Sequence, residues 1–319
     1  MTIFWNRDEG RLRAGWRVLL QALLAALLGV ALIVLVAEPL TALHRRGLFL
    51  SGHERAAYDR VINMIVGPLL TLCLVGSVVF AARVLDRREL RDFGIRFDRS
   101  WWSSLALGLS LGGFLMATVF AVESWAGWIA VADMLAVTVP GVSLLLALSF
   151  SLVKVLCVGI YEEVVVRGYL LRNLAEGTNL TAAVIVSSAI FAVLHATNDN
   201  STIVSTLGLF VNGLLFAAAL LITGRLSASI GLHIAWNLFE GVVFGFPVSG
   251  DKEGASFLVI AQRGPELLTG GAFGPEAGLV GIAASLIGIG VLMLWRVRTR
   301  QPWGRSTTAL FRPSGADMP

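Results

Sequence analysis

Ionisable and amide side chains interrupt apolar stretches in the second half of the chain. Glu162 and Glu163 are adjacent, His195 ends an apolar run, and Asn237 follows His233 by four residues. A charged side chain at the bilayer centre costs about 2.5 to 3.5 kcal/mol even on lenient insertion scales, so these residues need a reason to be there. A desolvated carboxylate is a stronger base than in water, and an imidazole beside it can orient a shared water. An imidazole N–H with an amide NH₂ can stabilise an oxyanion, so the set has the groups needed for peptide hydrolysis.

Spacing gives the two neighbouring glutamates different roles. Residues four apart lie on one helix face, so Glu163 can pair with Arg167. Glu162 is turned about 100° away from its neighbour and stays free to act as the base. The same rule places two further pairs on one helix face each: His233 with Asn237, and Phe191 with His195.

Helix register predicts that these side chains converge. If the chain turns near Gly177, Glu162 lies about 15 residues before the turn and His195 about 17 after it, which puts them within about 3 Å of one depth. His233 lies about nine residues past Gly224 and reaches the same layer if the earlier hairpin extends further into the cytoplasm. We therefore expect one water-accessible cavity, open to the cytoplasmic half of the bilayer.

The elements that must position these residues are membrane spans. The chain has 319 residues, of which 56% are hydrophobic and 14% charged, and its mean hydropathy is +0.78. This composition predicts an all-α, polytopic transmembrane helix bundle of about eight spans in the cell membrane. The expected spans cover residues 16–36, 61–82, 102–122, 142–161, 181–196, 203–223, 226–246 and 278–295.

The distribution of arginine predicts the orientation. Lys and Arg concentrate in cytoplasmic loops, and arginines follow the second, fourth, sixth and eighth spans, so both termini are expected in the cytoplasm. The loop between the first two spans disagrees, because four arginines there would be external, and the orientation of this hairpin stays open: Arg45, Arg46, Arg55 and Arg60. Lys154 is expected to extend to the outer face. Glu240 either lines the cavity or packs in the bundle.

Two other classes of interaction are not indicated. The formal net charge is only +4, and the Lys and Arg residues lie between apolar runs, so nucleic acid is not an expected partner. Cys73 and Cys157 both fall in apolar runs and are interpreted as packing residues. The expected surroundings are the lipid bilayer.

Three ordered motifs resemble those of the CPBP family of intramembrane proteases, which includes the CaaX prenyl endopeptidases and the abortive-infection proteins. The family pattern is Glu-Glu-x-x-x-Arg, then Phe-x-x-x-His, then His-x-x-x-Asn. Here these motifs are Glu162 to Arg167, Phe191 to His195, and His233 to Asn237, with Phe-x-x-Gly-Leu between the last two at Phe210 to Leu214. Each motif is weak alone, but their order on separate spans makes the resemblance specific over about residues 142–246.

The resemblance implies roles for six residues. Glu162 would be the general base, His195 would share its water, and His233 with Asn237 would stabilise the oxyanion. Glu163 and Arg167 would shape the site. The implied substrate is a membrane-embedded or lipidated protein or peptide. The expected regions are N-terminal helices with an interfacial segment (1–140), a catalytic helical core (141–246), and an external loop, last span and cytoplasmic tail (247–319).

Alternatives remain open on cofactor and function. No cofactor is favoured, although Glu162, His195 and His233 could together bind zinc. The sequence lacks the compact His-Glu-x-x-His zinc motif. The same three side chains could instead relay protons in a coupled transporter, or the fold could serve as a non-catalytic scaffold or immunity factor.

Overall fold

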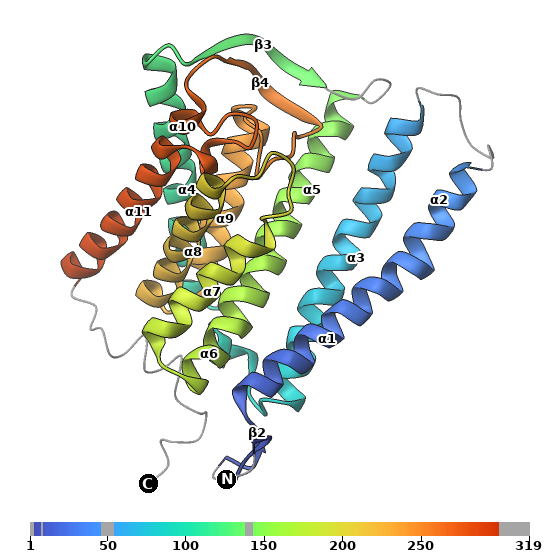
Figure 1. Ribbon diagram of the computed structural model, residues 1–319, viewed down its shortest axis with the longest axis vertical. Helices are drawn as coiled ribbons and strands as arrows, with labels where there is room; N and C mark the ends of the chain where they lie inside the picture. The colour runs from blue at the N-terminus through green and yellow to red at the C-terminus, as the bar shows by residue number, and fades with distance from the viewer. Residues whose placement is uncertain (1–2, 8, 46–53, 138–142, 300–319) are drawn as a thin grey trace.

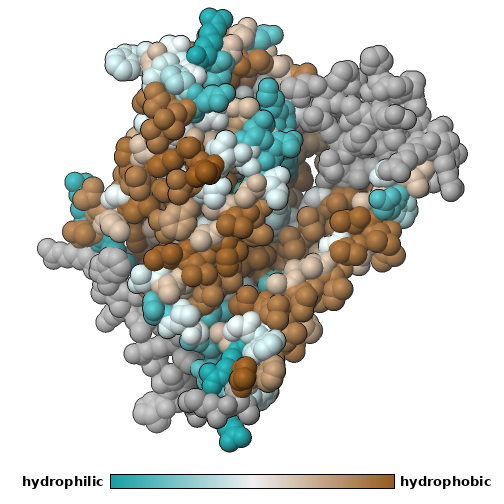
Figure 2. Space-filling model, viewed as in Figure 1, coloured by the Kyte–Doolittle hydropathy of each residue, from teal (hydrophilic) through white to brown (hydrophobic). Residues whose placement is uncertain are grey.

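The computed structural model describes residues 3–7, 9–45, 54–137 and 143–299. Within these ranges the chain is a bundle of helices that run alternately up and down in Figure 1. Arg46 and the tail at 301–319 lie outside the described residues. In Figure 2, hydrophobic side chains cover the middle of the molecule and hydrophilic ones gather at its two ends. This is the distribution expected of a bundle whose outer surface faces lipid.

Seven helical segments in the described part of the chain are long and apolar enough to cross a membrane: Ala14–Ala42, Met64–Val84, Arg99–Trp125, Leu144–Gly177, Ile203–Thr223, Leu226–Val243 and Leu279–Arg298. The predicted all-α polytopic bundle is therefore confirmed. The remaining expected span is α7 (Leu180–Leu194), which has only 15 residues. At about 1.5 Å per residue it is about 22 Å long, which is short of a hydrocarbon core of about 30 Å.

The N-terminal helices form a hairpin beside the rest of the bundle (Figure 1). A short ribbon of β1 (Trp5–Asn6) and β2 (Arg11–Leu12) precedes it. The first arm combines α1 (Ala14–Leu32), a π-helical segment (Ile33–Ala37) and α2 (Glu38–Arg45), and the second arm is α3 (Glu54–Val84). A 3₁₀ turn (Leu90–Phe93) leads to α4 (Arg99–Trp125).

The helices that carry the predicted site form two consecutive hairpins. α5 (Leu144–Glu163) continues through a π-helical segment (Val164–Leu170) into α6 (Leu171–Gly177), and α7 runs back. α8 (Ile203–Thr223) and α9 (Leu226–Asn237) follow, and α9 continues into a second π-helical segment (Leu238–Val243). The predicted turn near Gly177 is confirmed, because α6 ends at Gly177 and α7 begins at Leu180. The Asn179 side chain caps α7 by accepting from the Ala182 amide at 2.9 Å.

At the end of the bundle opposite the α6–α7 turn, strands and short helices connect the spans (Figure 1). β3 (Ile129–Val137) follows α4 and pairs antiparallel with β4 (Ala255–Gln262). A short helix α10 (Glu266–Thr269) and a 3₁₀ turn (Pro275–Ala277) then lead to the last span, α11 (Leu279–Arg298).

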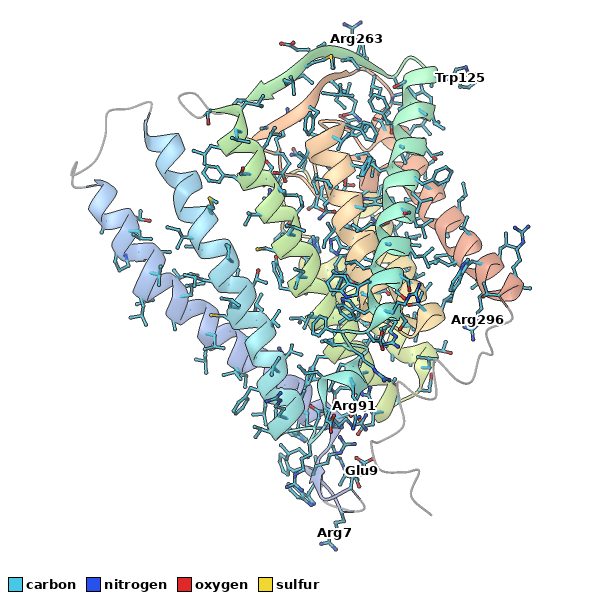
Figure 3. The ribbon with its side chains drawn as sticks, turned by 180° about the vertical axis from the view of Figure 1, so that it is seen from behind. Arg7, Glu9, Arg91, Trp125, Arg263 and Arg296 are labelled. Carbon is cyan, nitrogen blue, oxygen red and sulfur yellow. The ribbon has the colours of Figure 1, made fainter. Side chains whose placement is uncertain are left out.

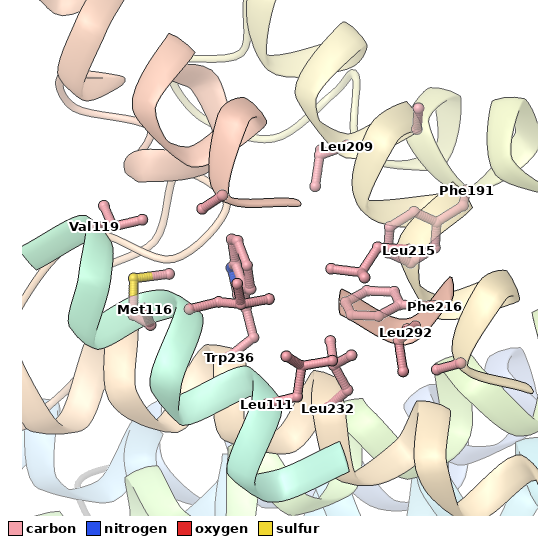
Figure 4. Packing of buried hydrophobic residues seen from close by; sticks show 14 of the residues in the cluster. Leu111, Met116, Val119, Phe191, Leu209, Leu215, Phe216, Leu232, Trp236 and Leu292 are labelled. Atoms are coloured by element: carbon pink, nitrogen blue, oxygen red, sulfur yellow. The ribbon is translucent and has the colours of Figure 1, made fainter. Parts of the chain in front are cut away.

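The core of the bundle is built around α9. Every residue of this helix is buried. Gly108 and Gly112 let α4 approach it closely, because a Cβ would lie 2.1 Å from the Ala228 oxygen at Gly108 and 2.4 Å from the Leu232 oxygen at Gly112. Figure 4 shows the cluster beyond this contact, where α4 and α9 contribute the labelled Leu111, Met116, Val119, Leu232 and Trp236. A rigid, central α9 fixes the position of any functional group that it carries.

An ionic cluster joins the N-terminus to α6. The Glu176 carboxylate accepts hydrogen bonds from Arg11, Arg17 and Arg88 at 2.7, 2.6 and 3.0 Å. Arg17 also pairs with the buried Asp86. The cluster therefore fastens the first hairpin to the helix that bears the predicted glutamates.

Candidate active site

Glu162, His195 and His233 meet inside the bundle. They belong to the last turn of α5, the C-terminal cap of α7 and the middle of α9. The Nε2 atom of His195 lies 3.8 Å from Oε2 of Glu162, and Nε2 of His233 lies 3.9 Å from the same oxygen. The prediction that these three side chains reach one depth is confirmed.

Hydrogen bonds on the far side of each ring determine which nitrogen faces Glu162. The Nδ1 atom of His195 lies 2.8 Å from the carbonyl oxygen of Phe191, which can only accept, so Nδ1 carries the proton. The Nδ1 atom of His233 lies 3.0 Å from Oε1 of Glu163 and donates to it. Both imidazoles therefore turn Nε2 toward Glu162.

Glu163 holds the other members of the site in place. Its carboxylate accepts from Arg167 at 3.0 Å, and both side chains are 0% exposed. The predicted pair is confirmed, but the expectation that it occupies Glu163 was incomplete. His233 donates to the same oxygen of Glu163, and the Ser229 hydroxyl donates to the other. Three donors from two helices thus converge on one buried carboxylate.

Aromatic rings enclose Arg167 and His233. The Arg167 guanidinium carbon lies 4.2 Å from the ring centroid of Phe191 and 5.2 Å from that of Phe216. The Phe216 ring stacks on His233 at 4.6 Å between centroids. Arg167 also donates to the Gly213 carbonyl at 3.3 Å, which gives the Phe-x-x-Gly-Leu segment a structural role.

Glu162 keeps one oxygen without a hydrogen bond. Its Oε1 accepts from the Tyr161 hydroxyl at 3.4 Å. Its Oε2 is buried and has no hydrogen-bond partner among the described residues. Because the two Nε2 atoms lie beyond direct hydrogen-bonding distance of this oxygen, the gap suits a bridging water.

The short length of α7 leaves room for a cavity. After Leu194 the chain leaves the helix at His195 and runs as turns to Thr202, the N-cap of α8. Asn198 fastens this segment by donating to the Ser249 carbonyl at 2.8 Å. Non-helical backbone at membrane depth is tolerated where it is buried in protein or lines a cavity.

A cavity of about 160 Å³ adjoins the histidines and Glu162. Asn237, which is 6% exposed, lines it together with His195 and His233. The rest of its wall comes from α5, α7 and the loops after α7 and α9, through Lys154, Val155, Val158, Glu162, Phe191, Asn198, Val248, Ser249, Asp251, Glu253 and Glu276.

The direction in which the cavity opens sets two predictions against each other. Its loop residues lie at the end of the bundle opposite the α6–α7 turn and the start of α1. Cytoplasmic termini and a cavity open to the cytoplasmic half of the bilayer therefore exclude one another. Both were expected together because α7 was taken for a full span, whereas it has only 15 residues and ends at the level of the site.

The part of the chain that carries these residues matches a known protein family. Residues 143–239 match the family described as Rce1-like, type II CAAX prenyl endopeptidase. This segment, which is less than half of the chain, supports the resemblance to the CPBP/CAAX proteases. No curated protein and no solved structure matches the chain. The match covers Glu162, His195, His233 and Asn237 and leaves residues 1–142 and 240–319 outside.

Several contacts of this candidate site were not predicted. Ser229 precedes His233 by four residues, so helix periodicity could have indicated that it shares the face of that histidine. No spacing in the sequence relates Phe216 to the other residues of the site. Glu276 joins the cavity from the turn before α11, where the Ser249 hydroxyl donates to it at 2.5 Å. Burial raises the pKa of the Glu276 carboxyl, and the hydrogen bond from Ser249 opposes this effect.

The positions of Lys154 and Glu240 resolve two open questions. The Lys154 ammonium lies 2.7 Å from Asp251 and 3.0 Å from Glu253, so it extends to the loop at the open end of the cavity. Glu240 is 0% exposed and is not among the described residues that line the cavity. Of the two roles considered for it, packing in the bundle is the one that its position supports.

The donor atoms do not form a metal site in this arrangement. Within the described ranges, no three His, Cys, Asp or Glu side chains are placed so that they could hold a metal ion. This includes the set considered for zinc, Glu162, His195 and His233. We derive no step through a metal.

Proposed function

We propose that the protein is an intramembrane endopeptidase that hydrolyses a peptide bond of a membrane-associated or lipidated protein or peptide. The observation that carries the proposal is the convergence of two imidazole Nε2 atoms on one carboxylate oxygen of Glu162, which has no hydrogen-bond partner among the described residues. The similarity of residues 143–239 to the Rce1-like CAAX prenyl endopeptidases supports the same reaction class.

In the proposed reaction Glu162 activates a water. One O–H of the water donates to Glu162 Oε2 and the other to His195 Nε2, which leaves an oxygen lone pair free to attack the peptide carbonyl. Glu162 takes a proton from the water as the new C–O bond forms. The same proton then passes to the departing amine as the C–N bond breaks, so the carboxylate is regenerated.

His233 and Asn237 are proposed to stabilise the oxyanion. They lie four residues apart on α9 and both line the cavity. The Asn237 amide can donate directly, and a doubly protonated His233 donates from Nε2 while Glu163 balances its charge. Preorganised donors of this kind typically contribute about 10² to 10³ in rate each.

Glu163 and Arg167 are positioning residues in this scheme. Neither is exposed, and the hydrogen bond from His233 connects Glu163 to the cavity. A carboxylate behind an imidazole fixes its tautomer and ring orientation. The aromatic rings over Arg167 and His233 restrict the same side chains further.

Comparison of protein termini in two membranes tests the proposal. Membranes with the wild-type protein should contain new peptide termini that are missing when Glu162→Gln is expressed at an equal level. The control is the double variant Cys73→Ala/Cys157→Ala, which changes no proposed catalytic residue and should give the wild-type set. Identical termini in wild-type and Glu162→Gln membranes would refute peptidase activity and favour a proton relay or a scaffold.

A further inference from the structure

The two ends of the bundle differ in basic residues. At the end where α3 meets α4, four arginines occur between the helices: Arg87, Arg88, Arg91 and Arg96. Arg225 joins α8 to α9 at this end, and Arg296 and Arg298 lie in the last turn of α11. Figure 3 shows Arg7 and Arg91 toward this end and Trp125 and Arg263 at the opposite one.

The connections at the other end are acidic by comparison. The segment from His195 to Thr202 carries Asp199 and neither Lys nor Arg. The long connection from Phe244 to Gly278 has two basic residues, Lys252 and Arg263, and four acidic ones. The α2–α3 connection is the exception, because Arg45, Arg46, Arg55 and Arg60 flank it. The remaining loops assign the arginine-rich end to the cytoplasm by the positive-inside rule.

The proposed catalytic cavity belongs to the acidic end. Its wall includes Asn198, Ser249 and Glu276, which come from the two connections just described. The Lys154 ion pairs with Asp251 and Glu253 attach the same loop to α5 at the cavity margin. None of the described lining residues comes from the α6–α7 or α8–α9 turns.

From these observations we infer that the site receives its substrate from the extracytoplasmic face, as an extended peptide segment next to a membrane anchor. The inference rests on the proposed function and specifies its substrate class. A lipidated tail in the cytoplasm would face the closed end of the bundle.

The depth of the site sets where the scissile bond lies. Glu162 follows Lys154 by eight residues on α5, which places it about 12 Å deeper at about 1.5 Å per residue. An extended peptide advances about 3.3 Å per residue and needs about four residues to cover that distance. The cleaved bond should therefore lie within about four residues of the point where the substrate passes the loop at Asp251.

Cysteine accessibility tests the orientation without any need for activity. In the Cys73→Ala/Cys157→Ala background, Ser100→Cys and Ser124→Cys place one thiol at each end of α4, and both positions are exposed. Thr197→Cys, also exposed, marks the segment beside the cavity. The probe is a membrane-impermeant maleimide, added to intact cells and to inside-out vesicles.

Thr197→Cys and Ser124→Cys should be labelled in intact cells, and Ser100→Cys only in inside-out vesicles. Labelling of Ser100→Cys alone in intact cells overturns the inference. Labelling of both ends of α4 in intact cells also overturns it, because the inference requires a single orientation.

The termini comparison distinguishes this inference from the proposed function. New termini in outward-facing juxtamembrane segments support both. Termini confined to cytoplasmic lipidated tails overturn the direction of entry and leave the peptidase assignment intact. If no termini differ, the proposed function fails and the substrate class fails with it, even if labelling confirms the orientation.

Discussion

The Nδ1–H of His233 donates to Oε1 of Glu163 at 3.0 Å, and this bond connects the candidate active site to a buried ion pair. The oxygen that receives it also accepts from Arg167. The two glutamates therefore differ in kind, because Glu163 is enclosed by donors whereas Glu162, which lines the cavity, keeps one buried oxygen with no hydrogen-bond partner among the described residues. Their neutral variants should fail in different ways.

Glu162→Gln should abolish turnover with little effect on folding. Glutamine is nearly isosteric but cannot take a proton, and loss of a general base typically costs about 10² to 10⁴ in rate. The measurements are cleavage of a membrane peptide substrate and the melting temperature of the detergent-solubilised protein. Full activity in this variant would refute the assignment of Glu162 as the base.

Glu163→Gln should lower both stability and activity. It leaves Arg167 without its anionic partner inside the bundle, and breaking a buried pair costs about 3 to 5 kcal/mol. It also removes the acceptor that orients His233. A melting temperature equal to that of wild type would mean that the ion pair contributes nothing to folding.

Adding Arg167→Gln to Glu163→Gln tests the pairing directly. Removing both charges should recover part of the lost stability, because no uncompensated charge remains. The recovery should be incomplete and activity should stay low, since Ser229 and His233 also bond to Glu163. The matched control is Glu162→Gln with Arg167→Gln, in which the second change should not restore activity.

Activity should survive removal of metal ions. Among the described residues no three potential ligands are arranged to hold one, and the proposed water is activated by Glu162 and His195 alone. The test is the metal content of the purified protein together with its activity before and after chelation. Stoichiometric zinc, with activity lost on chelation and restored by zinc, would overturn the metal-free mechanism.

Asp98 should make the start of α4 sensitive to acid. The hydrogen bond from the Ser100 hydroxyl, with the Trp101 amide and Arg225, lowers the pKa of Asp98 to about 2. A lowered folded-state pKa gives stability that is present above the unfolded value of about 3.9 and is lost as pH falls toward the folded value. Wild type should therefore melt above Asp98→Asn at neutral pH, and the difference should shrink between about pH 4 and pH 2. Asparagine can still cap the helix, so the variant loses the charge and keeps the cap. A difference in melting temperature that does not change with pH would therefore exclude titration of Asp98 as its cause.

The sequence alone predicted the membrane environment and the side chains that meet in the candidate site. Apolar stretches of membrane-spanning length dictate helices, because lipid offers the backbone no hydrogen bonds. Four-residue spacing paired Glu163 with Arg167, and counting residues from the turn at Gly177 brought Glu162 level with His195. These are local relationships that helix geometry fixes without knowledge of the neighbouring helices.

Only the tertiary structure decided what surrounds these residues and where the cavity opens. Ser229 and Phe216 act across helices, and their contacts with Glu163 and His233 depend on how α8 and α9 pack. Glu276 enters the site through a turn outside any expected span. The early end of α7 exposes the site to one face of the bundle, and hydropathy could not indicate it because the segment after His195 is held by a contact distant in sequence, from Asn198 to the Ser249 carbonyl.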